Sequence, residues 1–168
     1  MINLPDYDSF GSRPVNEAAY SMGFFSQEIN KRKAEIAELA EERKWLVKAY
    51  MKAEDASINV QNALADAEEA EANLRQEFES LFSSRFQNED GEVDASHDGS
   101  SDPEVNAMSK KIDATMSRNL KLASKVKATA INLQTAIDAL RHNSERASEL
   151  TSEIEGLNSK WRMAAIGR

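Results

Sequence analysis

Two long stretches of the chain carry apolar residues at alternating three- and four-residue steps, the spacing of one face of a helix. The first lies between Phe24 and Asp90 and the second between Glu104 and Glu155, and neither contains Gly or Pro. A period of 3.5 residues is kept in each over about eight heptads, which is typical of a coiled coil. The pattern predicts two long helices that pack along a narrow seam.

The predicted seam is a defined set of positions on each helix. On the first helix it comprises Phe25, Ile29, Arg32, Ile36, Leu39, Arg43, Leu46, Tyr50, Ala53, Ser57, Val60, Leu64, Ala67, Glu71, Leu74, Phe78 and Leu81. On the second it comprises Met108, Ile112, Thr115, Asn119, Leu122, Val126, Thr129, Leu133, Ala136, Leu140, Asn143, Ala147, Leu150, Ile154, Leu157 and Trp161.

Capping residues give the expected boundaries. Asp102 is placed to cap the second helix, with Pro103 at its first helical position. Asn16 is the expected cap of the first helix, and Gly23 a kink or restart within it. We therefore expect an extended N-terminal arm (1–15), a first helix (16–86), an acidic flexible loop (87–102) and a second helix (103–165).

Charge predicts how the two helices pair. If the loop joins antiparallel neighbours, position x faces about 189−x, and residues 62–79, with six acids and one Arg, face 110–127, with six Lys or Arg and one Asp. At the other end, 31–52 is net +3 and 137–158 is net −3. A parallel pair would set acid against acid, so we predict an antiparallel hairpin, in which Glu71 lies level with Arg118 and Asn119 as a polar register lock.

Composition limits the classes of protein. The 168 residues suit one domain, and 30% charged residues with only 7% aromatics suit long helices better than a compact core. There is no cysteine for disulfides or thiolate chemistry, and no basic, apolar leader of the Sec type. No stretch reaches the roughly 18 apolar residues of a transmembrane helix. The acidic balance, with a net charge of −8, disfavours nucleic acid as a partner.

The loop is the one segment whose residues resemble a metal site. Asp94, Ser96, Asp98 and Asp102, with Gly99 at the sharp turn, match ligand positions of a calcium loop. The closing position is occupied by Val105, however, and the nearest acid, Glu104, comes one place early. Asp102 also competes for the role of helix cap. We therefore interpret the loop as a solvated connection, and expect no metal or other cofactor.

Catalytic motifs are not evident in the sequence. His97 lies in the loop and His142 on the second helix, and neither has a partner spaced for a nucleophile–base pair or a metal cluster. The sequence also lacks a Gly-rich phosphate loop. We expect a binding protein rather than an enzyme.

Several large apolar residues lie beside the seam rather than on it. The predicted interaction face comprises Trp45, Ile58, Met116, Leu120, Ile131 and Ile137, with Val47, Ala123 and Ala130 near it. A two-helix hairpin cannot cover so many, so we expect a second chain or the N-terminal arm to contact them. The alternative is that they only widen the seam. Trp161 is on the seam, level with Ile29, and is expected to close the core, with Phe24 and Phe25 beneath it.

The layout of polar arm, long helix, polar insert and C-terminal coil, with its tail "LTSEIEGLNSKWRMAAIGR", resembles the filament and translocator proteins of bacterial type III secretion. The resemblance covers about the last 60 residues. The short insert and the strongly charged first helix depart from that pattern. The resemblance implies a subunit that is exported without a Sec signal and whose helices bundle axially into a filament.

The functional expectation is a structural protein that oligomerises through its helices, with itself or other helical proteins as partners. Two alternatives come from other classes. One is a virion, scaffold or packaging component of a phage, or an intracellular adaptor or chaperone that binds one protein. The other is a calcium-responsive switch, which would require the acidic loop to bind metal.

Overall fold

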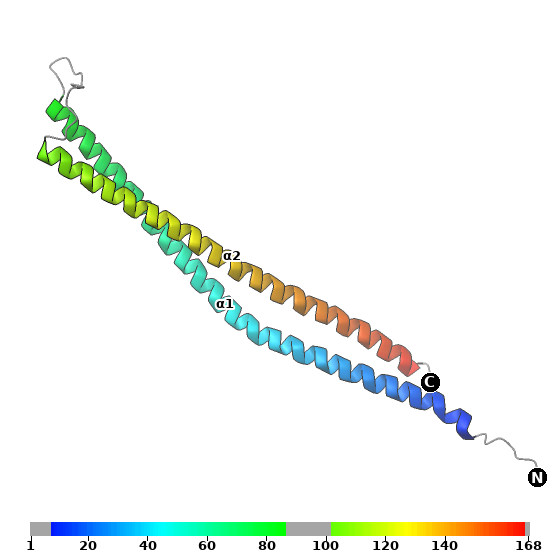
Figure 1. The fold of residues 1–168 in the computed structure, drawn as a ribbon. Coiled ribbons are helices and arrows are strands. Elements are labelled where there is room, and N and C mark those ends of the chain that lie inside the picture. The colour runs from blue at the N-terminus through cyan, green and yellow to red at the C-terminus, as the bar shows by residue number, and fades with distance from the viewer. Residues whose placement is uncertain (1–7, 87–101, 167–168) are drawn as a thin grey trace, which may run out of the picture. The chain divides into compact units, whose positions relative to one another are not determined.

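The fold is an all-α helical hairpin, as predicted (Figure 1). The structure, a computed structural model, describes residues 8–86 and 102–166. Helix α1 spans Asp8–Phe86 and helix α2 spans Pro103–Ile166, and the two pack against each other. Within the described ranges there is no β-strand.

The predicted N-terminal boundary is wrong. Because α1 begins at Asp8, residues 8–15 are helical rather than extended, and Asn16 lies inside the helix instead of capping it. Pro14 fixes its own φ near the helical value, but it lacks a backbone N–H and its ring crowds the carbonyl four residues earlier. Lengthening an existing helix adds about one hydrogen bond per residue, so extension can continue past such a residue. The remainder of the predicted arm, residues 1–7, lies outside the described residues.

The helix is also uninterrupted at Gly23, where a kink or restart was expected. A side chain at this position would meet no atom within 4 Å, so packing does not demand a glycine there. A glycine inside a helix costs about 1 kcal/mol relative to alanine. In a helix of 79 residues that cost is too small to force a break.

The ends that flank the acidic segment agree with the sequence. Helix α1 ends at Phe86 and α2 begins at Pro103, one residue after Asp102. The Asp102 carboxylate accepts hydrogen bonds from the backbone N–H of Glu104 at 2.8 Å and of Val105 at 3.2 Å. Asp102 is therefore the N-cap of α2. The other predicted calcium ligands, Asp94, Ser96 and Asp98, lie outside the described residues.

The hairpin divides into two compact units, each built from one segment of α1 and one of α2. Unit 1 combines Met1–Ala49 with Ala136–Arg168, and unit 2 is Tyr50–Thr135. In unit 2, Glu71 contacts Asn119 while the later residue Arg85 contacts the earlier Glu104. In unit 1, Arg32 contacts Glu153 and the later Arg43 contacts Ser144. The helical segments of each unit are thus antiparallel, as the charge pattern predicted.

The seam positions are those predicted. All seam residues of α2, and all those of α1 apart from the exposed Arg43, are buried or half-buried. The most deeply buried apolar residues are Ile29 and Leu150 in unit 1, and Ala67 and Val105 in unit 2. Each unit therefore has a narrow line of contact between two helices and no rounded core. This is the packing expected from a strict 3.5-residue period.

The aromatic residues near the chain ends pack only in part as predicted. Trp161 is half-buried and shares a shallow hollow with Ile29, Ser26, Asn30 and Asn158. Phe24 and Phe25 meet edge to face, with ring centroids 5.8 Å apart. Phe24 is nevertheless exposed, because it points away from the seam while Phe25 lies on it.

Candidate functional site

Two asparagines on α2 form matching polar layers inside the seam. In unit 2 the buried Asn119 donates from Nδ2 to the backbone carbonyl of Ala67 at 3.2 Å and to the Glu71 carboxylate at 2.6 Å. The predicted contact between Glu71 and Asn119 is therefore present. The Asn119 Oδ1 atom is buried without a hydrogen-bond partner. A buried oxygen in that state costs free energy, so this layer contributes more to pairing specificity than to stability.

Unit 1 repeats this arrangement. Asn143 donates from Nδ2 to the carbonyl of Leu39 at 3.1 Å and to the carboxylate of Glu42 at 2.9 Å. In both layers one amide joins a backbone oxygen and a nearby carboxylate of α1. An asparagine in such a layer finds these two acceptors only in one axial alignment of the helices. The two layers therefore fix the register of each unit.

Glu71 is the acid whose ionisation the fold alters most clearly. The guanidinium of Arg75, one turn further along α1, donates to it at 2.7 and 3.0 Å. These bonds lower the pKa of Glu71, aided by the bond from Asn119 and opposed by partial burial. Glu71 is therefore a charged member of the seam at neutral pH.

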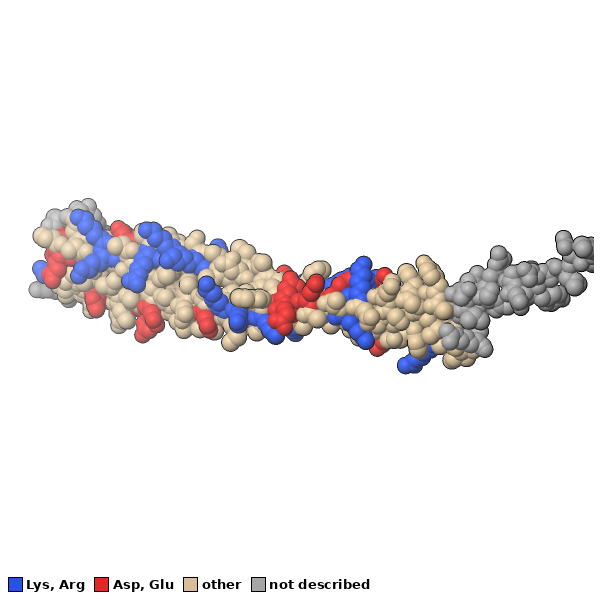
Figure 2. All heavy atoms as spheres, turned by 90° about the horizontal axis from the view of Figure 1, so that it is seen from below, with Lys and Arg blue, Asp and Glu red and all other residues tan. Residues whose placement is uncertain are grey.

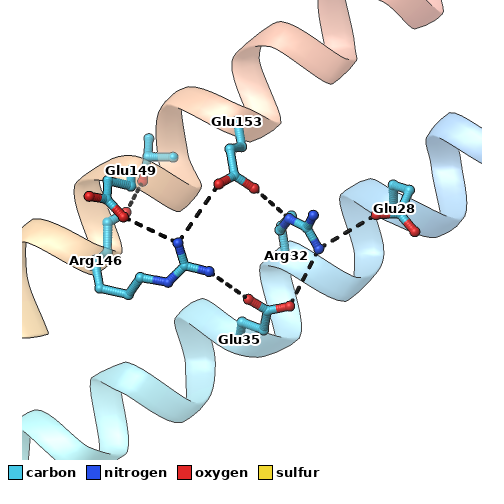
Figure 3. Close-up of polar contacts among 8 residues, drawn as sticks. Glu28, Arg32, Glu35, Arg146, Glu149 and Glu153 are labelled. Carbon is cyan, nitrogen blue, oxygen red and sulfur yellow. Dashed lines mark hydrogen bonds and ion pairs between the residues drawn. The ribbon is translucent and has the colours of Figure 1, made fainter.

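A network of ion pairs covers one side of unit 1 (Figure 3). Arg32 reaches across the seam to Glu153 at 2.6 Å, and Arg146 reaches back to Glu35 at 3.6 Å. Each arginine is also paired within its own helix, Arg32 with Glu28 at 3.5 Å and Arg146 with Glu149 at 3.2 Å. The hydrogen bond to Glu153 is the main reason that the pKa of Arg32 is raised. Linked pairs of this kind favour one pairing of helices more than an isolated exposed pair does.

Within residues 8–86 and 102–166, no three His, Cys, Asp or Glu side chains are arranged to hold a metal ion. His142 lies exposed on α2, and the raised pKa of Tyr50 follows from its hydrogen bond to Glu54 at 2.8 Å. Neither helix of the described part has a segment long and apolar enough to span a membrane.

All six residues of the predicted interaction face are exposed. Trp45 and Leu120 are each 72% exposed and Ile131 is 67% exposed, and Ile58, Met116 and Ile137 are exposed to lesser degrees. The alternative, that these residues widen the seam, is disfavoured for Trp45, Leu120 and Ile131 by their exposure, while Met116 and Ile137 are each only 40% exposed. A two-helix hairpin leaves them in contact with solvent.

The six residues do not all lie on one face of the hairpin. The sequence analysis did not predict this division. Each residue in a helix turns about 100° from the one before. Since the helices of a unit are antiparallel, a residue one place after a seam position points to the same side of the pair from either helix. Arg75 follows Leu74 and Met116 follows Thr115, and the Arg75 guanidinium lies 3.3 Å from the Met116 sulfur. We call this side of unit 2 the apolar flank.

The apolar flank of unit 2 contains Met51, Ile58, Met116 and Leu120, each one place after a seam residue, with Ile131 at its outer margin. Small residues complete it, namely Ala65 and Ala72 on α1 and Ala123 and Ala130 on α2. Trp45 instead comes one place before Leu46 and belongs to unit 1, where Lys48 sits 5.1 Å from its ring centre. Ile137 also belongs to unit 1.

The charges of unit 2 are arranged by helix. Six Lys or Arg residues lie in 110–127 of α2, while 62–79 of α1 hold six acids. Within the described part of the chain, none of those six cations lies in an ion pair, and Glu71 is the one acid of the six that does. Figure 2 shows blue side chains gathered along one edge of this end of the molecule and red ones along the other. Attraction between residues 62–79 and 110–127 therefore acts at longer range than direct contact.

Some exposed apolar residues were not singled out from the sequence. These are Met51 in unit 2, and Tyr20, Met163 and Ile166 in unit 1. Met51 precedes Ile58 by one heptad, so the same period that marked Ile58 would have found it. The other three lie beyond the ends of the predicted seam, where the heptad gives no signal.

Comparison with protein-family models, with curated proteins and with solved structures found no match to this chain.

Proposed function

We propose that this protein is a non-enzymatic assembly protein, which oligomerises by packing its exposed helix flanks against other helices. The observation that carries the proposal is the exposure of large apolar side chains along both helices, foremost Trp45, Leu120 and Ile131. Exposed apolar side chains that gather on one flank, as Met51, Ile58, Met116 and Leu120 do in unit 2, favour a binding role. A third or fourth helix is the partner that such a surface fits, because helix pairs bury apolar flanks in bundles.

The seam supports the same proposal. In both polar layers an asparagine forms hydrogen bonds that fix the alignment of the two helices. A chain that served only as a spacer would not need a fixed alignment. A hairpin with a fixed register presents its flank residues at fixed spacings. A rigid spacing is what a repeating or symmetric assembly requires.

The test is the mass of the full chain in solution, measured by light scattering across a concentration series. We expect a mass that rises with concentration above that of one 18.7 kDa chain. Growth into large species would favour a filament subunit of the kind that the secretion resemblance implies, and a plateau would favour a closed oligomer. A mass of one chain at every concentration would refute self-assembly, and would favour the adaptor that binds a different protein.

A further inference from the structure

We propose that an acidic row on α1, in unit 1 of one copy of this chain, binds a basic row on α2, in unit 2 of a second copy, with the two helices running in the same direction. The acidic row is Glu28, Glu35, Glu38 and Glu42, and the basic row is Lys111, Arg118, Lys121 and Lys125. The inference rests on the proposed function and adds to it a partner, a pair of surfaces and a direction.

Each row lies along one side of its helix, because every member comes one place before a seam residue. Glu28 precedes Ile29 and Lys111 precedes Ile112, and the other six members follow the same rule. The spacing within the two rows is identical, since both advance by seven, then three, then four residues. Residues at these steps share one side of a helix. Two helices that lie side by side in the same direction can therefore match all four charges at once.

The basic row has no ion-pair partner among the described residues. None of its four cations pairs with another described residue, and all four are exposed. The acids of residues 62–79 act on them only at longer range. The row is therefore a line of cations open to an acidic partner.

The acidic row keeps an excess of negative charge despite the ion-pair network of unit 1 (Figure 3). In that network two arginines serve four acids, of which Glu28 and Glu35 belong to the row. Neither Glu38 nor Glu42 lies in an ion pair with another described residue, and Glu42 accepts only from the neutral Asn143 amide. Because a carboxylate has several lone pairs, each acid can accept from a further cation.

The acidic row also borders a hollow that a basic side chain fits. The residues that line it are Glu35, Glu38, Leu39, Glu42, Arg146 and Leu150. Three carboxylates and one guanidinium leave it net acidic. Four of the lining residues stand at i, i+3, i+4 and i+7 of α1, which is the hole that a coiled-coil knob enters. In the proposed alignment Lys121 lies level with Glu38, so its aliphatic stem covers the leucines while its ammonium group meets the carboxylates.

Charge selects this alignment over its neighbours. Residue x of α1 lies level with residue x+83 of α2, so that each of the four acids meets a cation, and Lys31, which lies between them, meets Ala114. A shift of one heptad either way leaves two attractive pairs and adds one pair of like charges. In the reverse direction three attractive pairs remain, but Lys31 meets Lys121. Opposed like charges cost free energy, so the parallel alignment is favoured.

The sizes of the side chains agree with the same alignment at both ends of the rows. Trp45, which is 72% exposed, lies level with the exposed Ala128. Phe24, which is 51% exposed, lies level with the exposed Ala107. All four residues come one place before a seam residue, on the same sides as the charged rows. Large residues therefore meet small ones, as packed helices require, and two aromatic rings leave water.

The match requires a second copy because one chain cannot form it. In both units the helical segments of α1 and α2 are antiparallel, whereas the matched rows run in the same direction. A second copy brings the same basic row with the same spacing. Since the two surfaces differ, each bound copy has a further row to offer, and contacts of this kind generate rings or open filaments.

The first experiment compares two double variants of the full chain by light scattering at low salt. One variant, Arg118→Gln with Lys121→Gln, removes two charges of the basic row, and the other, Lys110→Gln with Lys127→Gln, removes two exposed charges outside it. Both change the net charge equally, and circular dichroism with thermal melting checks that the helices are kept. We expect the first to weaken association by about tenfold and the second to leave it unchanged. Equal association of the two variants would show that the basic row is not the interface.

The second experiment tests the alignment by disulfide formation, for which the chain offers no competing cysteine. Lys31 lies level with Ala114 in the proposed contact, and Ala128 lies two heptads further along the same side of α2. We expect Lys31→Cys chains mixed with Ala114→Cys chains to form a mixed disulfide under mild oxidation. Lys31→Cys chains mixed with Ala128→Cys chains should form little. Equal linking in the two mixtures, or preferential linking to Ala128→Cys, would overturn the alignment.

These outcomes separate the inference from the proposed function. A wild type that stays monomeric contradicts both. A wild type that assembles, while the two double variants associate equally well, contradicts only the choice of surfaces. Loss of association in the basic-row variant alone, with the mixed disulfide formed at Ala114→Cys, supports both.

Discussion

At the scale of single residues, Asn119 and Asn143 give the hairpin its register. Each places one side-chain amide between a backbone carbonyl and a carboxylate of the opposing helix. A slip of the helices would part the amide from both acceptors. The Glu71 carboxylate adds a charged partner, held in place by Arg75.

We predict that Asn119→Ala lowers the free energy of unfolding by about 1–3 kcal/mol, because it removes two cross-helix hydrogen bonds and leaves a small void. Asn119→Leu should be close to neutral, since it also removes the unpaired Oδ1 atom. Chemical denaturation measures both, with the exposed Ser117→Ala as control. Equal losses in the Ala and Leu variants would contradict this account.

The register role of Asn119 makes a separate prediction. Spin labels on cysteines introduced at the exposed residues Glu69 and Lys121 should give one narrow distance distribution in the otherwise unchanged chain, measured under conditions that keep it monomeric. In Asn119→Leu the distribution should broaden, because an apolar layer accepts several alignments. A distribution as narrow as before would mean that Asn119 does not set the register.

The lowered pKa of Glu71 implies that the stability of the hairpin depends on pH. That pKa is lowered in the folded state by Arg75 and Asn119. The contribution of the Glu71 charge to stability is therefore fully present above the ordinary glutamate pKa of about 4.3. It is lost as the pH falls through the lowered pKa of the folded state. We expect the wild type to lose more stability than Glu71→Gln between neutral pH and about pH 3, as measured by denaturation at each pH. Parallel curves for the two proteins would refute it.

At the scale of the element, the start of α2 is fixed by three neighbours. The Asp102 carboxylate caps the helix, Pro103 occupies its first position, and Arg85 of α1 reaches Glu104 at 2.6 Å. Val105 lies buried directly beneath them. Local capping and tertiary contact therefore agree on where this helix begins.

We expect Asp102→Ala to cost about 0.5–2 kcal/mol of stability, because two N–H groups of the first turn lose their acceptor. Asp102→Asn should retain most of the cap, since its side-chain oxygen still accepts. Denaturation midpoints test this, with Asp113→Ala, an exposed change within α2, as the matched control. The account fails if Asp102→Ala and Asp113→Ala are equally mild.

At the scale of the whole molecule, the distribution of charge supports the antiparallel pairing even though none of the six cations of 110–127 lies in an ion pair with another described residue. Reversing three cations there, in the variant Lys111→Glu, Arg118→Glu, Lys125→Glu, should lower the melting temperature below that of the matched triple Gln variant. The difference in melting temperature between the two variants should become smaller when the salt concentration rises from about 10 mM to about 1 M, because the Debye length falls from about 30 to about 3 Å. A gap that did not respond to salt would point to altered packing instead.

The periodicity of the apolar residues predicted nearly all of the fold. Seam, antiparallel pairing and both helix ends beside the acidic segment follow from a heptad, a charge pattern and an Asp-Pro cap, all of which can be recognised in the order of the residues. The N-terminal boundary was missed, since Gly11 and Pro14 weaken a helix without stopping one that is already formed.

The sequence by itself determined which residues lie on the seam and which remain exposed, because in a two-helix hairpin burial follows directly from the helical period. Only the tertiary structure decided how the exposed residues divide, with Leu120 and Ile58 on one flank of unit 2 and Trp45 in unit 1. It also showed that, among the described residues, none of the six cations of 110–127 lies in an ion pair. Both depend on how two helices are rotated and spaced about their common seam, and that geometry exists only once they have packed.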